Sequence, residues 1–139
     1  MEYKKFDSQY VVRIDKGEEI VDTLREFCKE NDINLGSVSG IGAVDKIKIG
    51  LFETSSKEYH GTELNGDHEI TNLTGNISTK DDEIYLHLHI NLSDSKYNTY
   101  GGHLNSAVVS GTCEIIINEI EGKVDREFSD EIGLNLYKF

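Results

Sequence analysis

The segment from residue 84 to residue 92 constrains the fold more than any other part of the chain. Its apolar residues occupy every second position, a period that fits a β-strand with one buried face. The apolar positions are Ile84, Leu86, Leu88, Ile90 and Leu92, and those between them are Tyr85, His87, His89 and Asn91. The pattern therefore predicts a strand with one face on a core and two histidines on the other.

A single helix is predicted ahead of the sheet. Apolar residues recur at helical spacing between Glu18 and Asn31, with polar residues on the opposite face. Residues 15–19 (DKGEE) supply capping side chains and an acidic first turn, which suit a helix N-terminus. Residues 9–14 (QYVVRI), just before it, are typical of a short strand.

Strand patterns prevail in the rest of the chain. Residues 47–51 alternate in polarity, and residues 108–109 and 113–117 are rich in β-branched side chains. Short polar breaks that indicate hairpin connections fall at residues 55–57, 65–67 and 79–82. One helix followed by hairpin-linked strands predicts an α+β fold, a mostly antiparallel β-sheet with one main α-helix packed on it.

The length of 139 residues is enough to bury a core, so one domain over residues 1–139 is predicted. The sequence has no apolar run of about 18 residues, and its N-terminus turns polar at once. Cys28 and Cys113 stand alone within apolar patterns, as buried thiols in a reducing compartment do. We therefore expect a cytoplasmic protein without a membrane partner.

The charge balance bears on nucleic-acid binding. Lysine and arginine number 14 against 26 aspartates and glutamates, which gives a formal net charge of -12 and a pI near 4.7. A surface of this kind repels phosphate backbones. Direct contact with nucleic acid is therefore not expected.

The histidines suggest a metal site. His87 and His89 project from the same face of the predicted strand, roughly 6.5 to 7 Å apart. If the chain turns back near Lys96, antiparallel pairing places His103 opposite His89 on that face. Residues 101–102, both glycine, fit a bulge or a close backbone approach there. Three neutral imidazoles form the ligand set of catalytic zinc sites, and they also accept iron, nickel or copper.

An alternative interpretation is that these histidines pair at a subunit interface without metal. Glu114 alternates with apolar neighbours and is a candidate carboxylate to act beside a metal. His60 and His68 lie in polar, loop-like surroundings and are expected at the surface. The glycine-rich residues 37–44 lack the third glycine of a phosphate-binding loop and precede a strand pattern, which favours a tight strand-to-strand bend.

Four motifs in this order resemble the PPC family, also called DUF296. They are SVSGIGAV at 37–44, LTGNIS at 73–78, LHLHI at 86–90 and GGHL at 101–104. The resemblance implies a small α+β domain that forms homotrimers around a central antiparallel sheet. Plant members join this domain to AT-hooks that grip the DNA minor groove, and this sequence has no arginine-glycine-arginine-proline hook.

The domain is more remotely similar to part of acetolactate decarboxylase, in which three histidines, including an HxH pair, hold zinc. That likeness implies that His87, His89 and His103 are metal ligands, with zinc the expected ion, but it assigns no reaction. The first functional hypothesis is a stand-alone trimeric PPC protein of unknown specific activity that binds a divalent metal, with room for a small-molecule ligand. The second is a DNA-binding or transcription-associated oligomerisation module without catalytic activity.

Overall fold

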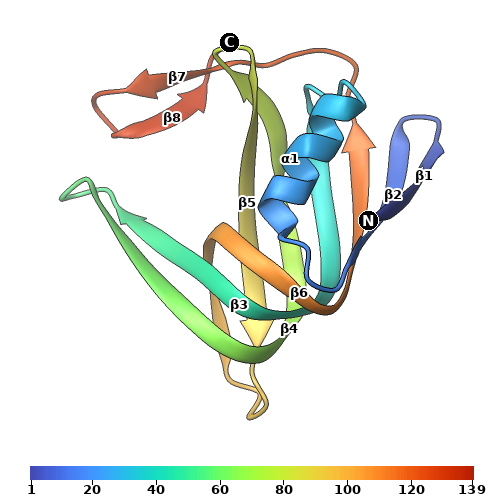
Figure 1. Cartoon of the computed structure of the whole chain (residues 1–139). Coiled ribbons are helices and arrows are strands. Elements are labelled where there is room, and N and C mark those ends of the chain that lie inside the picture. The colour runs from blue at the N-terminus through green and yellow to red at the C-terminus, as the bar shows by residue number, and fades with distance from the viewer.

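The computed structural model describes residues 1–139 and is mostly antiparallel β-sheet with one short helix (Figure 1). This confirms the predicted fold class. The elements are β1 (Glu2–Phe6), β2 (Gln9–Asp15), α1 (Ile20–Glu30), β3 (Gly36–Glu53), β4 (Glu58–Lys80), β5 (Glu83–Ser93), β6 (Thr99–Glu119), β7 (Arg126–Ser129) and β8 (Leu134–Tyr137). Strands β1, β7 and β8 were not predicted from the sequence.

Six strands form one sheet in the order β1-β2-β6-β3-β4-β5, and β6 also pairs with β5. Strands β3, β4, β5 and β6 therefore close into a ring. The long strand β6 is shared, since residues 99–103 pair with β5, residues 103–119 with β3 and residues 112–118 with β2. Strands β7 and β8 form a separate hairpin at one end of the molecule (Figure 1).

Helix α1 covers one face of this sheet and packs against β5 and β6 (Figure 1). Its N-cap is Glu19, whose carboxylate accepts hydrogen bonds from the N–H of Asp22 at 2.7 Å and from the N–H of Ala107 on β6 at 2.8 Å. The buried side chains of the helix are Ile20, Val21, Leu24, Phe27 and Cys28. Since side chains alternate along β5, burial of Leu88 and Ile90 in the core leaves the histidines on the opposite face.

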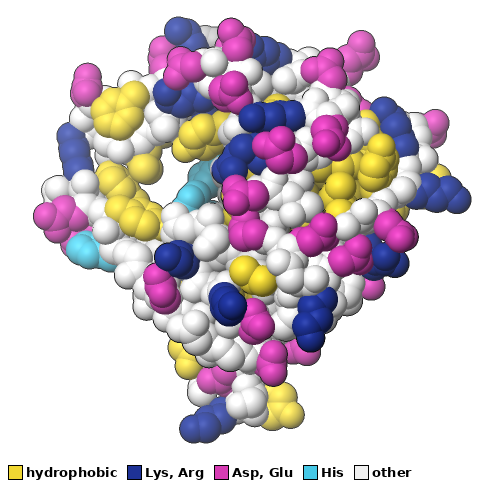
Figure 2. Space-filling view, viewed as in Figure 1, with side chains coloured by type: hydrophobic (Ala, Val, Ile, Leu, Met, Phe, Trp, Pro, Cys, Tyr) yellow, Lys and Arg dark blue, Asp and Glu magenta, His cyan; other side chains and the backbone are white.

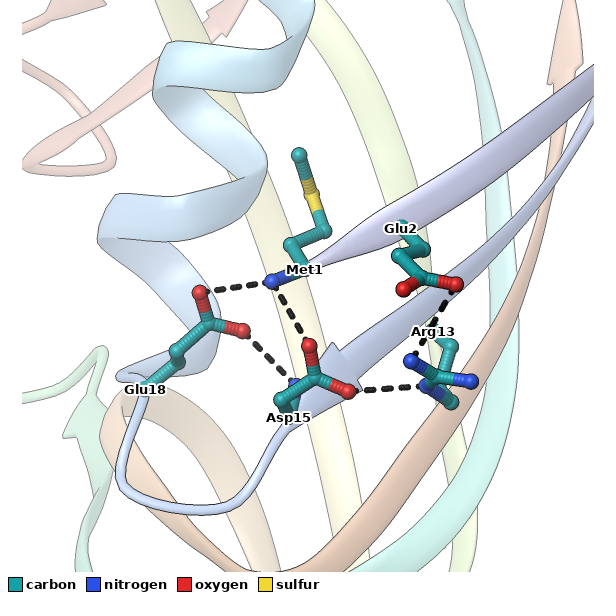
Figure 3. A network of polar contacts seen from close by, with 5 residues as sticks. All are labelled: Met1, Glu2, Arg13, Asp15 and Glu18. Atoms are coloured by element: carbon teal, nitrogen blue, oxygen red, sulfur yellow. Dashed lines mark hydrogen bonds and ion pairs between the residues drawn. The ribbon is translucent and has the colours of Figure 1, made fainter.

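The loop before α1 is tied to the first residue of the chain (Figure 3). The amino group of Met1 forms ion pairs with Asp15 and Glu18, both at 2.9 Å. Arg13 in turn pairs with Asp15 at 2.8 Å and with Glu2 at 3.3 Å. The pKa of Glu18 is lowered by the Met1 amino group and by a hydrogen bond from the backbone of Asp15. The network links β1 and β2 to the start of the helix.

Two of the predicted breaks lie inside continuous strands. Residues 65–67 were expected to be a hairpin connection, but they belong to β4, where the register shifts against β3 and Gly66 has a φ of +93°. Residues 37–44 were expected to be a bend between two strands, but they belong to β3 alone, whose pairing is irregular there. Bulges bend a strand without ending it, so residues typical of turns occur in mid-strand. The breaks at 55–57 and 79–82 do lead from β3 to β4 and from β4 to β5.

Both cysteines are buried thiols, as predicted. Burial raises the pKa of Cys28 to about 12, and burial together with the charge of Glu114 raises that of Cys113 to about 12. Neither thiol is therefore poised for reaction. The helix, with 11 residues, falls short of the length and apolar character needed to cross a membrane.

Candidate metal centre

Three histidines converge on the face of the sheet opposite α1. The ring centroids of His87 and His89 are 5.2 Å apart, and that of His103 lies 5.4 Å from His87 and 5.6 Å from His89. One ring nitrogen of each lies within 4.8 Å of the others. Zinc held at about 2.0–2.1 Å in tetrahedral geometry needs nitrogens about 3.3 Å apart. Small side-chain rotations would bring the three nitrogens to that separation, so the donor set fits a metal.

The pairing of β5 with β6 brings these residues together. His89 lies directly opposite His103, which is the predicted register. The turn between the strands is held by Asp94, whose carboxylate accepts hydrogen bonds from the N–H groups of Lys96 at 2.8 Å and Asn98 at 2.9 Å. Because the turn fixes the register, it also fixes which side chain faces His89.

The glycines before His103 allow a close approach of strands rather than a bulge. The register of β5 and β6 continues without a shift through Gly101 and Gly102. A Cβ on Gly102 would lie 2.7 Å from the carbonyl oxygen of Gly50 on β3, and one on Gly101 would collide with the side chain of Asn91. Strand β6 can therefore pair closely with both β3 and β5 at this point only because Gly101 and Gly102 lack side chains.

Burial adjusts the basicity of two of the imidazoles. The pKa of His87 lies below its ordinary value, mainly through burial and then through the nearby His103, Arg126 and His89. The pKa of His103 is also lowered, by burial and then by His89. Both shifts favour the neutral imidazole, the form that binds a metal. His89 is the most exposed of the three, so the cluster stays open to solvent on one side.

An aromatic side chain supports His103 from the β3–β4 hairpin. The rings of Tyr59 and His103 meet edge to face with centroids 6.3 Å apart. The hydroxyl of Tyr59 donates to the side-chain oxygen of Asn105 on β6. It occupies the space that a side chain at Gly50 would take. This packing limits the orientations that His103 can adopt.

Arg126 lies beside the cluster and was not identified from the sequence. Its charge contributes to the lowered pKa of His87. It begins β7, and its Nε donates to the hydroxyl of Ser78 at 2.8 Å. The surrounding residues 123–129 (KVDREFS) carry no pattern that marks an arginine as buried. Only the packing of β7 against β4 could reveal it.

Other predicted residues lie outside the cluster. Glu114 is exposed on the arm of β6 that pairs with β2, where it lies opposite Arg13. It is eleven residues beyond His103 along β6. The prediction that Glu114 acts beside the three histidines is therefore wrong. His60 is exposed as predicted, but it joins Glu53 and Glu58 in a second group with ligand atoms within 4.8 Å. His68, also expected at the surface, is buried.

His68 is buried because its strand position places it on the core side, opposite the fully buried Val44. Its Nδ1 lies 2.7 Å from the carbonyl oxygen of Gly66, and its ring packs against Tyr100 with centroids 6.1 Å apart. The bulge at residues 65–67 turns the side chain inward. Polar neighbours in the sequence therefore did not indicate exposure at this position.

Solved structures of the same fold come from several microorganisms. A Bacteroides thetaiotaomicron protein whose name proposes DNA binding is 39% identical, with a TM-score of 0.97, over 99% of this chain and 96% of its own. A metal-containing protein from Archaeoglobus fulgidus is 35% identical, with a TM-score of 0.89, over 99% and 96% of the two chains. A Pyrococcus horikoshii protein described as plant- and prokaryote-conserved (PPC) is 33% identical, with a TM-score of 0.89, over 99% and 94%.

No curated protein matches the sequence. A family model does, and it matches residues 1–121, which include all three histidines of the cluster. The segment from β7 onward, with Arg126, lies beyond the matched residues. The match covers most of the chain and agrees with the family that the sequence motifs predict. The chain therefore belongs to the family of the Plants and Prokaryotes Conserved (PCC) domain.

Proposed function

We propose that this protein binds one divalent metal ion, zinc in the first instance, through His87, His89 and His103. The observation that carries the proposal is the convergence of three ring nitrogens within 4.8 Å on one face of the sheet. The metal-containing relative from Archaeoglobus fulgidus supports it. A three-histidine zinc ion with an open position polarises a carbonyl oxygen or lowers the pKa of a bound water.

The metal content of purified protein tests this proposal. After dialysis against zinc and then buffer, we expect one zinc per chain in the wild type and essentially none in the H87A/H89A double variant. His60→Ala is the matched control, because it removes a histidine from the exposed group with Glu53 and Glu58. It should keep the zinc of the wild type. If His60→Ala lost its zinc and the H87A/H89A variant kept it, the ion would be bound by the group of His60, Glu53 and Glu58, and the proposal would be wrong.

We also propose that the protein works as a homotrimer, as the family resemblance implies. The outer face of the sheet carries apolar side chains that a partner would cover. Val11 and Ile116 lie opposite each other on β2 and β6 and are 45% and 39% exposed. Ile41 on β3, also on this face, is 59% exposed. Apolar side chains gathered on one face are typical of an association surface.

The DNA-binding alternative is supported by the name of the Bacteroides thetaiotaomicron relative. The formal net charge of -12 opposes it, since phosphate contacts depend on lysine and arginine. We expect no binding of duplex DNA in a titration repeated at 50 and 200 mM salt. Saturable binding at both salt concentrations would favour the hypothesis of a DNA-binding module.

A further inference from the structure

Arg126 is a buried cation, and one of its guanidinium nitrogens forms no hydrogen bond. The residue is 8% exposed. Its Nε donates to the Ser78 hydroxyl at 2.8 Å, and its Nη1 donates to the carbonyl oxygen of Asn135 at 3.0 Å. Its Nη2 is buried and has no hydrogen-bond partner in the chain. A buried guanidinium nitrogen without a hydrogen-bond partner destabilises the folded chain. A hydrogen-bond acceptor that binds at this position would remove that cost.

The surroundings of the guanidinium fix its orientation. The group lies over the ring of Tyr85 at 4.7 Å from the centroid and over the ring of Tyr137 at 4.2 Å. The two aromatic contacts hold its plane, and the hydrogen bonds to Ser78 and Asn135 hold two of its three nitrogens. The free nitrogen is therefore pre-positioned, as a binding group must be.

Strand pairing places this group on the histidine face. Ser78 pairs with Tyr85 across β4 and β5, and the next pair on the same face is Asn76 with His87. Tyr85 and His87 are two residues apart on β5, which corresponds to about 7 Å. Arg126 packs on Tyr85 and thus stands next to the three-histidine cluster.

A gap in the molecular surface lies on the histidine side of this region (Figure 2). Figure 2 shows a gap in the molecular surface between the β7–β8 hairpin and the β3–β4 hairpin, with a histidine side chain at its margin. The two hairpin tips meet where Nζ of Lys57 donates to the carbonyl oxygen of Asp130 at 2.6 Å. Gly133 fits against Phe52 at the same place. The tips thus close the outer side of the opening.

The free nitrogen selects a carboxylate over a phosphate. A guanidinium that has already used Nε and Nη1 offers one end to a ligand, which suits a single carboxylate oxygen. A dianionic phosphate would need more donors than remain, and the net charge of -12 repels it more strongly.

We propose that Nη2 of Arg126 binds the carboxylate of a small monoanionic ligand beside His87, His89 and His103. The assignment deepens the proposed function and rests on it for a second contact, between another oxygen of the ligand and the metal. The contact with Arg126 itself does not depend on metal. It is therefore testable on the metal-free protein.

Glycolate is a suitable probe, and glycolamide is its neutral counterpart of the same shape. We expect glycolate to saturate the metal-free protein in a calorimetric titration and to shift the Nε–Hε signal of Arg126 in nuclear magnetic resonance spectra, while glycolamide does neither. In Arg126→Met the affinity should fall about 10- to 100-fold, since a charge-assisted hydrogen bond is lost. Arg25→Met, which removes an exposed arginine of α1, should bind as the wild type does.

Zinc binding by the same variants separates this proposal from the metal site. Folded Arg126→Met should keep its zinc, because no metal ligand is removed. Equal glycolate affinity in wild type and Arg126→Met, absence of saturable binding, or equal binding of glycolamide would overturn the carboxylate site. Joint loss of zinc and glycolate would also overturn it, by assigning Arg126 a structural role. If Arg126→Met does not fold, the glycolate-induced shift in the wild type and the affinity of Arg126→Lys decide.

Discussion

The imidazoles of the candidate centre combine partial burial with access to solvent. His87 and His103 are half-buried, and burial lowers the pKa of each. Their neutral forms therefore persist to lower pH than that of a free histidine, whose pKa is about 6.5. The lowered pKa values favour neutral His87 and His103 at neutral pH, while the exposed side of the cluster stays accessible to an incoming molecule.

Gly102→Ala tests the close approach that positions His103. The added Cβ would lie 2.7 Å from the carbonyl oxygen of Gly50, so β3 and β6 must separate. We expect the free energy of unfolding to fall by about 1–3 kcal/mol, as overpacking does, and the zinc affinity to fall with it. Urea unfolding and zinc titration measure the two effects.

Gly111→Ala is the control on the same strand. Its Cβ would lie 3.5 Å from that of Ala43, an ordinary contact. The change in unfolding free energy should stay within about 1 kcal/mol, with unchanged zinc affinity. If both alanine variants bind zinc as the wild type does, close packing at Gly102 does not position His103.

At the scale of elements, the turn between β5 and β6 decides whether the histidines meet. Asp94 holds this turn, and its pKa is lowered to about 2, first by the side chain of Asn98 and then by backbone N–H groups and Tyr100. Ionised Asp94 thus stabilises the folded state. The contribution is complete above the unfolded pKa of 3.8 and is lost as the pH falls through about 2.

Asp94→Asn removes this dependence. We expect the wild type to be more stable than the variant at pH 5 and the difference to shrink between pH 4 and pH 2. Thermal unfolding over that range measures it. Asp67→Asn, at an exposed carboxylate without such contacts, should track the wild type at every pH. A constant difference between wild type and Asp94→Asn would show that the charge does not support the turn.

Much of this architecture is predictable because the strongest patterns are local. The alternation from residue 84 to residue 92 and the helical spacing from Glu18 to Asn31 correspond to β5 and α1. The register of His89 with His103 follows from the position of a single short turn. An element is predictable from the sequence when a single local polarity pattern specifies it, as in α1 and β5.

The remaining features depend on contacts between distant segments. Residues 65–67 have turn chemistry, yet pairing with β3 on one side keeps them in a strand. His68 is buried by that same bulge, and Arg126 by the packing of β7 against β4. A glycine or aspartate that suits a turn also suits a bulge, so composition could not distinguish the two.

For the whole molecule, the proposed homotrimer is the property to measure first. Light scattering on a size-exclusion column should give three times the chain mass of 15.7 kDa. Ile116→Asp should reduce that mass, because it replaces an exposed apolar side chain of the outer face with a charge. Ile120→Asp, at an exposed isoleucine beyond the end of β6, should leave it unchanged. A monomeric wild type would refute the proposal.

The shared strand β6 determines when the protein can complete its fold during synthesis. It joins partners as distant as residues 9–15 and 89–93, and the ring cannot close without it. Pairings of such high sequence separation form slowly. During synthesis, residues 1–98 must wait for residues 99–119 to emerge from the ribosome before the ring can close. His103 arrives with that strand, so the three-histidine cluster is complete only at this late stage of synthesis.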